Sequence, residues 1–278
     1  MTLDRILFGT AGVPNGTDKK NSPVDGVKKV HDLGLDCMQL EFAHGVRMKE
    51  EVSSNLRKIS YELDVPLTSH GPYYINLNAR EQDKIDSSVE RIIQTAKISD
   101  LCGAESMTFH AAFYMKDSPF DVFDLVEKSL NVIEERLNRL DIEIELRPEL
   151  TGKTSQFGSL EELIALAKSV GSCRPCMDFS HLYARTGKYN TYEEFNEVLQ
   201  TLSKELGRDA LDNMHIHISG VSSNSKGDLK HLNLEKSNFN WKDLIRSLKD
   251  NNCKGYMISN SPNLEDDAIM LKNFYHSY

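Results

Sequence analysis

The chain has 278 residues with 33 basic and 42 acidic side chains, which gives a formal net charge of −9 and a pI near 5.5. This acidity argues against a general nucleic-acid coat protein, because phosphate binding needs a basic footprint. It does not exclude a metalloenzyme that acts on nucleic acid, since bound cations change the sign of the local field.

The number of cysteines and the lengths of the apolar runs indicate the cellular compartment of the protein. The five cysteines are odd in number and follow no framework spacing, which favours a reducing cytoplasm, and we interpret Cys173 and Cys176 as structural thiols. No charged-then-apolar leader opens the chain, and no stretch approaches the roughly 18 apolar residues of a membrane span. We therefore expect a soluble cytoplasmic protein with no membrane partner.

Short apolar runs typical of strands recur along the whole sequence. They cover residues 6–12, 37–42, 66–71, 106–111, 142–149, 174–181, 213–219 and 255–260. Helical patterns lie between them, and the clearest are 84–102 and 121–140, where apolar residues recur on one stripe. Helix N-caps are predicted at Ser22, Thr191 and Asn240.

Eight strands that alternate with helices imply parallel strands joined by crossovers. Eight such units in about 250 residues is the size of a (β/α)₈ TIM barrel. A doubly wound open sheet is the alternative architecture. No linker or low-complexity tract interrupts the chain, so we expect residues 1–278 to form a single TIM-barrel domain.

Metal-ligand residue types follow these apolar runs. In a barrel of this kind, the carboxyl ends of the strands and the loops after them form the catalytic face. Six of the nine histidines lie at ends of predicted strands. The candidate ligands at these ends are His70, His110, Glu149, Asp178, His181, His215 and His217. Zinc prefers imidazole nitrogen and carboxylate oxygen, and Mn²⁺ or Fe²⁺ accepts the same set, so the pattern predicts a metal centre.

Some histidines and one motif receive a plainer interpretation. His215 and His217 are two residues apart, so in a strand they face the same side, and either both enter the site or one supports it from behind. His44 follows the second strand, and we favour a role outside the site for it. Gly152-Lys153-Thr154 is not the tail of a phosphate loop, because the glycine required five residues earlier is Arg147.

Several motifs together resemble the endonuclease IV family of apurinic/apyrimidinic endonucleases, within the xylose-isomerase-like TIM barrel superfamily. The resemblance runs over nearly the whole chain and is nearest to archaeal-looking members. The motifs are Ser69-His70-Gly71-Pro72-Tyr73-Tyr74-Ile75-Asn76-Leu77, Arg147-Pro148-Glu149 with Gly152, Gln156-Phe157-Gly158, Asp178-Phe179-Ser180-His181 and Ser261-Pro262-Asn263-Leu264-Glu265.

The resemblance implies a centre of up to three zinc ions. The first would be held by His70, His110 and Glu149. Glu149, as a bridging ligand, would hold the second together with Asp178 and His215. The third would be held by His181, His231 and an aspartate shortly before His231. The resemblance also implies that Tyr73 borders the abasic pocket, and Arg47 is a candidate for insertion into the DNA minor groove.

This chain departs from the family pattern at two positions. Asn260 stands where the family places a final glutamate ligand, and an amide is a poor zinc ligand; His217 or a water is the candidate replacement. The third-zinc aspartate is out of register, because Leu229 occupies the position two before His231, and Asp228 lies three before it. A flexible loop rich in Gly and Ser could still bring Asp228 to this site.

The resemblance implies metal-dependent hydrolysis of duplex DNA on the 5′ side of an abasic site, as in base excision repair. Glu149 would be the catalytic residue that orients the attacking water, while Arg47, Lys49, Lys226 and Lys230 would contact phosphates. Two alternatives stay open: a metal-dependent sugar isomerase or epimerase on the same barrel, and a non-catalytic descendant that binds damaged DNA.

Overall fold

The computed structural model describes residues 3–19, 22–224 and 226–278, and the side chains of residues 228 and 229 are outside the description. Eight parallel strands form one sheet in the order β5-β4-β3-β2-β1-β10-β7-β6. They are β1 (Ile6–Ala11), β2 (Cys37–Glu41), β3 (Leu67–His70), β4 (Ala104–Phe109), β5 (Glu145–Pro148), β6 (Cys176–Asp178), β7 (Met214–Ile218) and β10 (Gly255–Ser259).

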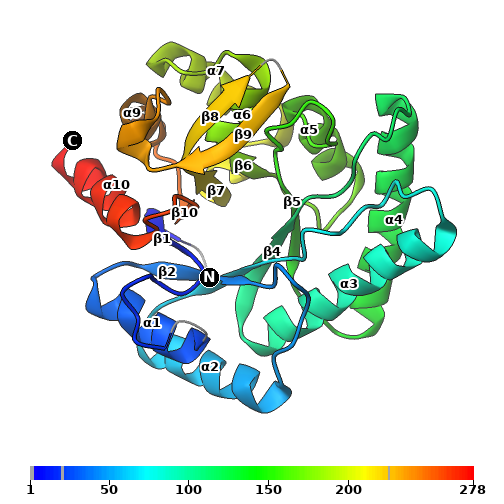
Figure 1. Cartoon of the computed structure of the whole chain (residues 1–278), viewed down its shortest axis with the longest axis horizontal. Coiled ribbons are helices and arrows are strands. Elements are labelled where there is room, and N and C mark those ends of the chain that lie inside the picture. Colours follow the sequence, from blue (N-terminus) through cyan, green and yellow to red (C-terminus); the bar gives the residue numbers. More distant parts are fainter. Residues whose placement is uncertain (1–2, 20–21, 225) are drawn as a thin grey trace.

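The two ends of this sheet meet, because β5 and β6 are joined by backbone hydrogen bonds. The Leu150 amide donates to the Cys176 carbonyl and the Arg174 amide to the Leu146 carbonyl, each at 2.9 Å. Helices surround the strands in Figure 1. The predicted (β/α)₈ barrel is therefore confirmed, and the doubly wound open sheet is wrong.

The helices alternate with the strands and cover the outside of the barrel. They are α1 (Pro23–Asp32), α2 (Glu50–Glu62), α3 (Gln82–Leu101), α4 (Pro119–Arg139), α5 (Leu160–Ser169), α6 (Phe179–Thr186), α7 (Tyr192–Leu206), α8 (Asp209–Asp212), α9 (Trp241–Asp250) and α10 (Glu265–Ser277), with a 3₁₀ turn at Leu234–Lys236. The predicted N-caps are confirmed: Ser22, Thr191 and Asn240 each accept a hydrogen bond from the amide three residues on. Among the described helices, none is both long and apolar enough to cross a bilayer.

Polar side chains fill the inside of the barrel below the carboxyl-end rim. Arg147, which is 1% exposed, donates to Glu145 and to the side-chain oxygen of Asn213. Two residues after Arg147 and directly after the strand, Glu149 reaches the rim. A buried ion-paired layer thus supports the floor of the site from beneath.

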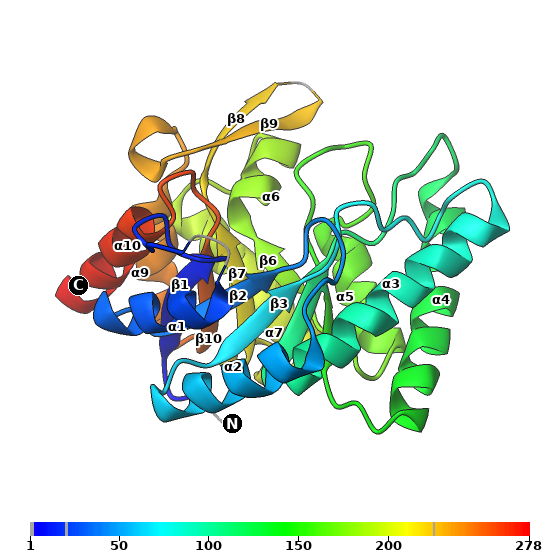
Figure 2. The same cartoon turned by 60° about the horizontal axis from the view of Figure 1, so that its bottom comes forward.

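A two-stranded hairpin rises above the barrel between β7 and α9, as Figure 2 shows. Its antiparallel strands are β8 (Gly220–Asn224) and β9 (Gly227–Leu232). The expected flexible loop is therefore wrong, because ladder pairing organises this segment and Gly227 takes the positive φ of +98° beside the turn. The expectation for the Asp228 side chain lies outside the described residues.

Candidate metal centre

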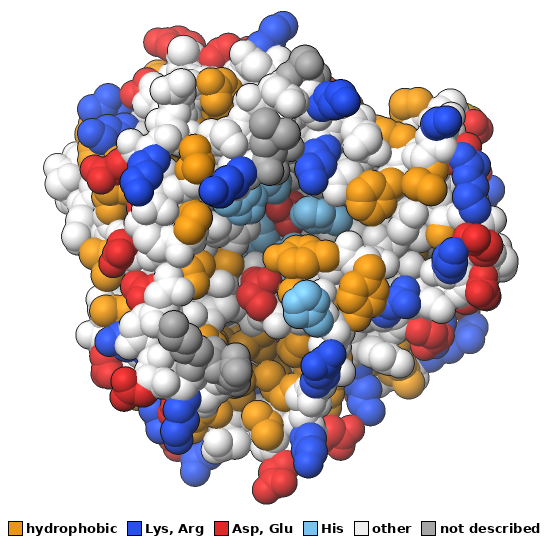
Figure 3. Space-filling model, in the orientation of Figure 1, with side chains coloured by type: hydrophobic (Ala, Val, Ile, Leu, Met, Phe, Trp, Pro, Cys, Tyr) orange, Lys and Arg blue, Asp and Glu red, His pale blue; other side chains and the backbone are white. Residues whose placement is uncertain are grey.

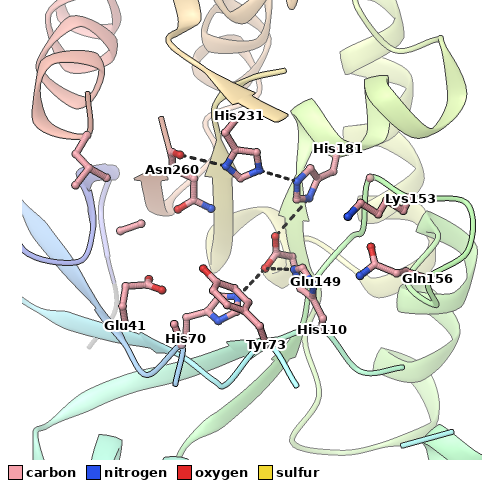
Figure 4. Close-up of a pocket in the computed structure, with 14 residues that line it drawn as sticks. Glu41, His70, Tyr73, His110, Glu149, Lys153, Gln156, His181, His231 and Asn260 are labelled. Atoms are coloured by element: carbon pink, nitrogen blue, oxygen red, sulfur yellow. Dashed lines mark hydrogen bonds and ion pairs between the residues drawn. The ribbon is translucent and has the colours of Figure 1, made fainter. Parts of the chain in front are cut away.

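Glu149 lies at the centre of the candidate site. It follows β5 directly and is 2% exposed. Its Oε2 lies 3.1 Å from His70 Nε2, where β3 ends, and 3.4 Å from His110 Nε2, which follows β4. The structure therefore brings together the three residues expected around the first metal, as Figure 4 shows.

The structure also places Asp178 and His217 beside Glu149. Asp178 ends β6 and caps α6, and its Oδ1 accepts a hydrogen bond of 2.7 Å from the His181 amide. His217 Nδ1 lies 3.3 Å from Glu149 Oε2. Asp178 Oδ2 and His217 Nδ1 are both buried without a hydrogen-bond partner. Buried polar atoms rarely lack a partner, and two such atoms beside one carboxylate fit a cation-binding site.

His181 and His231 form a second pair of facing rings. His181 lies in the first turn of α6 and His231 on β9, so the helix and the hairpin bring them together. Their Nε2 atoms are 3.2 Å apart, and the other ring nitrogens contact carbonyls, His181 Nδ1 at Leu150 and His231 Nδ1 at Asn260. A carbonyl only accepts, so each Nδ1 carries a proton, and the two Nε2 atoms point at each other at hydrogen-bonding distance.

The hydrogen bonds of Gln39 likewise determine which ring nitrogen of His217 carries the proton. Its amide nitrogen donates to Glu41 Oε1 at 2.8 Å, so its Oε1 accepts from His217 Nε2 at 2.8 Å and from His215 Nε2 at 3.1 Å. With Nε2 protonated, a neutral His217 presents the lone pair of Nδ1 to the Glu149 carboxylate. Two acceptors at 3.3 Å repel unless a proton or a cation lies between them.

His215, expected to hold the second metal, does not join the group around Glu149. It lies two residues before His217 on β7 and therefore deeper in the barrel, where its Nδ1 contacts Ser106 Oγ at 3.2 Å. Gln39 and Ser106 occupy both ring nitrogens. His217, expected as an additional or supporting residue, takes the place beside Glu149 and Asp178 instead. His215 and His217 also lie close to the Cys176 sulfur, which is buried below the rim.

The charges of these groups shift their pKa values in the directions that favour an ion pair between Glu149 and His70. Burial by itself raises the pKa of Glu149, but the nearby His217 and His110 hold it well below its usual range. Burial lowers the pKa of His70, yet the hydrogen bond to Glu149 and the charge of Glu41 outweigh it and raise the pKa to about 9. Burial lowers the pKa of His215. Glu149 is thus a buried anion that requires a compensating positive charge.

A cavity of about 440 Å³ opens above these residues and is lined by His70, Tyr73, Glu149, His181, His231 and Asn260, among others. Tyr73 is 54% exposed, with its ring 5.3 Å from that of His70. Arg47 is exposed and lines a neighbouring pocket rather than this cavity. Figure 3 shows the histidines around a hollow, with lysine and arginine side chains at its margin. His44 lines the neighbouring pocket, away from the candidate metal ligands.

Among the polar residues that line the cavity, Glu41, Lys153 and Gln156 received no role at the site in the sequence interpretation. Glu41 ends β2, so the rule that found His70 and Asp178, a ligand type at the end of a strand, also applies to it. Lys153 lies in the loop after Glu149, where the sequence was considered only as a phosphate-loop motif. Gln156 does not lie at the end of a strand, so the same rule does not identify it.

The fold and this arrangement of side chains define the class of protein. Residues 27–273 match the family described as "Xylose isomerase-like TIM barrel". An uncharacterized protein of Methanocaldococcus jannaschii is 40% identical over 272 residues, which is 98% of this chain and 97% of that protein. The chain belongs to the xylose isomerase-like TIM barrel family.

Within that family, the chain is similar at low identity to proteins described as endonuclease 4. The endonuclease 4 homolog of Dictyostelium discoideum is 25% identical over 196 residues, 69% of this chain and 36% of that protein. A probable endonuclease 4 of Aster yellows witches'-broom phytoplasma is 25% identical over 184 residues, 65% of this chain and 62% of that protein. The alignments therefore cover less than two thirds of both endonuclease relatives.

Solved structures agree on the fold. Endonuclease IV from Thermus thermophilus superimposes with a TM-score of 0.76 at 20% identity, covering 98% of this chain and all of that one. A D-tagatose 3-epimerase-like protein superimposes with a TM-score of 0.71 at 16% identity, covering 98% and 97%. At such identities the likeness concerns the barrel and leaves the reaction to the residues of the site.

Proposed function

We propose that this chain is a divalent-metal-dependent phosphodiesterase that incises duplex DNA on the 5′ side of abasic sites, with zinc as the preferred metal and Mn²⁺ or Fe²⁺ as further candidates. One observation carries the proposal: imidazole nitrogens of His70, His110 and His217 lie within 3.1–3.4 Å of a single oxygen of buried Glu149. Such a convergence of nitrogen and oxygen donors fits a metal centre of the kind that the resemblance to the endonuclease IV family implies.

The donors divide into three neighbouring groups. His70, His110 and Glu149 would hold one cation, and Glu149, Asp178 and His217 a second, with Glu149 shared. His181 and His231, whose Nε2 atoms face each other, would hold a third, together with Asp228 if its side chain reaches them. The carbonyl and amide partners behind these rings support the assignment, because metal-binding histidines are usually oriented by such hydrogen bonds.

The residues of the chain have distinct tasks in this reaction. Bound cations would polarise the phosphodiester, make the attacking water more acidic and neutralise charge on the leaving oxygen. Glu149 would orient that water at the cavity floor. Tyr73, half-exposed beside His70, would border the flipped abasic sugar. Arg47, with its exposed side chain, would enter the gap in the base stack.

We place this activity in the cytoplasm. All five cysteines are free and buried, among them Cys173 and Cys176. Proteins of reducing compartments keep their thiols in this form.

Incision of an abasic duplex by zinc-loaded protein is the deciding measurement. An end-labelled duplex with one abasic site should be cut on its 5′ side, and Glu149→Gln should reduce the rate by about 100-fold or more, because it removes the carboxylate that both proposed cation groups share. The metal content of both proteins is measured by elemental analysis, so that loss of metal is separated from loss of chemistry. No incision above the Glu149→Gln background would refute the proposal.

A sugar isomerase or epimerase is the second candidate, because the chain is acidic overall and Asn260 stands where the endonuclease IV family places a glutamate ligand. Such an enzyme needs one or two cations and no DNA. Two or fewer metal equivalents per chain, no salt-dependent DNA binding and turnover of a ketose would select it. The third possibility, a non-catalytic DNA-binding descendant, predicts tight abasic-DNA binding without turnover in any divalent metal.

A further inference from the structure

Glu41 is an acidic residue of the cavity to which the proposed function assigns no task. It ends β2 and pairs in register with His70 of β3, so the two side chains leave neighbouring strands on the same side of the sheet. Glu41 lines the same cavity as Glu149 and Asn260. Figure 4 shows its carboxylate at the edge of the cavity, near His70.

A fully buried side chain holds the Glu41 carboxylate in place. Gln39, two residues earlier and 0% exposed, donates its amide nitrogen to Glu41 Oε1 at 2.8 Å. The amide oxygen of Gln39 is held in turn by His217 Nε2 at 2.8 Å and His215 Nε2 at 3.1 Å. The position of Glu41 is therefore linked by hydrogen bonds to His217, one of the proposed metal ligands.

Small residues keep the space between Glu41 and Asn260 open. The strand between them in the barrel, β1, ends in Ala11 and is followed by Gly12. Ala11 lines the cavity, and a Cβ on Gly12, whose φ is +90°, would lie 3.2 Å from Glu41 Cγ. A larger side chain at either position would fill the space that Glu41 needs to extend toward Asn260.

We propose that Glu41 supplies the carboxylate ligand that Asn260 does not provide, so that β2 rather than β10 completes the donor set for a divalent cation beside His70. The inference rests on the proposed metal centre. A carboxylate oxygen is a donor that zinc or manganese accepts, whereas the amide of Asn260 is a weak one. Gln39 is then a positioning residue, because its two ends orient both Glu41 and His217.

Metal affinity of Glu41→Gln tests this inference without any assay of activity. Metal-stripped wild type, Glu41→Gln and the matched control Glu51→Gln, at an exposed position of α2, compete with a chromogenic chelator for zinc. Glu41→Gln should weaken one zinc site by about tenfold or more, and Glu51→Gln should leave every site unchanged. The visible spectrum of the Co²⁺-substituted protein should change in Glu41→Gln alone.

A second variant separates metal ligation from an effect on folding. Asn260→Glu in the Glu41→Gln background returns a carboxylate from the neighbouring side of the cavity and should restore the lost affinity. If wild type binds metal and Glu41→Gln binds it equally well, the inference fails and the proposed centre stands. If wild type binds no metal, the proposed centre fails as well. A lowered melting temperature in Glu41→Gln with no restoration by Asn260→Glu would also overturn the inference.

Discussion

At the scale of single residues, His215 and His217 illustrate how depth in the barrel determines chemistry. Both side chains point inward from β7, but two residues of a strand separate them by about 6–7 Å along the barrel. At the lower level, His215 is enclosed by Gln39 and Ser106. At the upper level, His217 turns Nδ1 toward Glu149. The same residue type therefore supports the site from below in one case and faces its centre in the other.

This difference in depth predicts different effects of matched substitutions. His217→Asn should weaken zinc binding by about tenfold or more, because it removes a nitrogen that faces Glu149. His215→Asn should have the smaller effect, since it disturbs only the hydrogen bonds of Gln39 and Ser106. Chelator competition with both variants, alongside circular dichroism as a check on folding, measures the contrast. Equal losses of affinity, or a larger loss for His215→Asn, would contradict the assignment.

Period-two alternation in the sequence predicted the face of His215 and His217 but not their depth. The spacing from His181 matched the endonuclease IV family at His215, and only the strand register identifies His217 as the neighbour of Asp178. Local sequence patterns also could not predict the contact between His181 and His231, because this contact depends on where the hairpin lies over α6. By contrast, the strand-end rule placed His70, His110 and Glu149 together, because parallel strands deliver their carboxyl ends to one rim.

At the scale of elements, the strands and helices followed from periodicity, whereas the β8–β9 hairpin did not. Residues 220–232 carry few apolar side chains to reveal strand alternation, and their glycines and serines are typical of loops. Pairing with each other, rather than burial, makes them strands. His231 reaches the cavity because this hairpin folds over the rim, where its Nδ1 contacts the Asn260 carbonyl.

The ion pairs of Asp36 join the first strand to the last helix, and they predict a pH-dependent contribution to stability. Asp36 accepts hydrogen bonds from Arg5, the Phe8 amide and Lys272 of α10. Burial alone would raise the pKa of Asp36, but these bonds outweigh it and lower the pKa below its ordinary 3.8. A depressed pKa stabilises the fold above the unfolded-state value, and this contribution is lost as the pH falls through the folded-state value.

Asp36→Asn should therefore lower the free energy of unfolding at pH 7 by about 1–3 kcal/mol. The difference from wild type should shrink as the pH falls below about 4, where the unfolded-state carboxyl becomes protonated. Urea unfolding at pH 7, 5, 4 and 3 measures it, with Asp18→Asn, at an exposed position, as the control. A difference that stays constant over this range would show that Asp36 acts by packing instead of charge.

At the scale of the whole molecule, the charge is unevenly distributed. The chain carries a net charge of −9, yet lysine and arginine side chains lie along the upper margin of the hollow that holds the histidines in Figure 3. Lys153 lines the cavity with an exposed side chain, in the loop directly after Glu149. A DNA backbone would meet these cations first, and the acidic remainder of the surface would oppose binding elsewhere.

Lys153 should consequently contribute one phosphate contact, which is measurable through salt dependence. Each such contact adds a slope of about 0.9 to the fall of log K with log salt, so Lys153→Met should reduce the slope by about that amount. It should also weaken binding about equally across DNA sequences, because phosphates carry no base information. Lys28→Met, an exposed lysine of α1 on the outside of the barrel, is the matched control and should change neither quantity. Fluorescence anisotropy with an abasic duplex, at several salt concentrations and with the Glu149→Gln background to prevent cutting, gives both slopes. If Lys153→Met leaves the slope unchanged while Lys28→Met reduces it, DNA approaches the barrel from its side and not across the histidine-lined hollow.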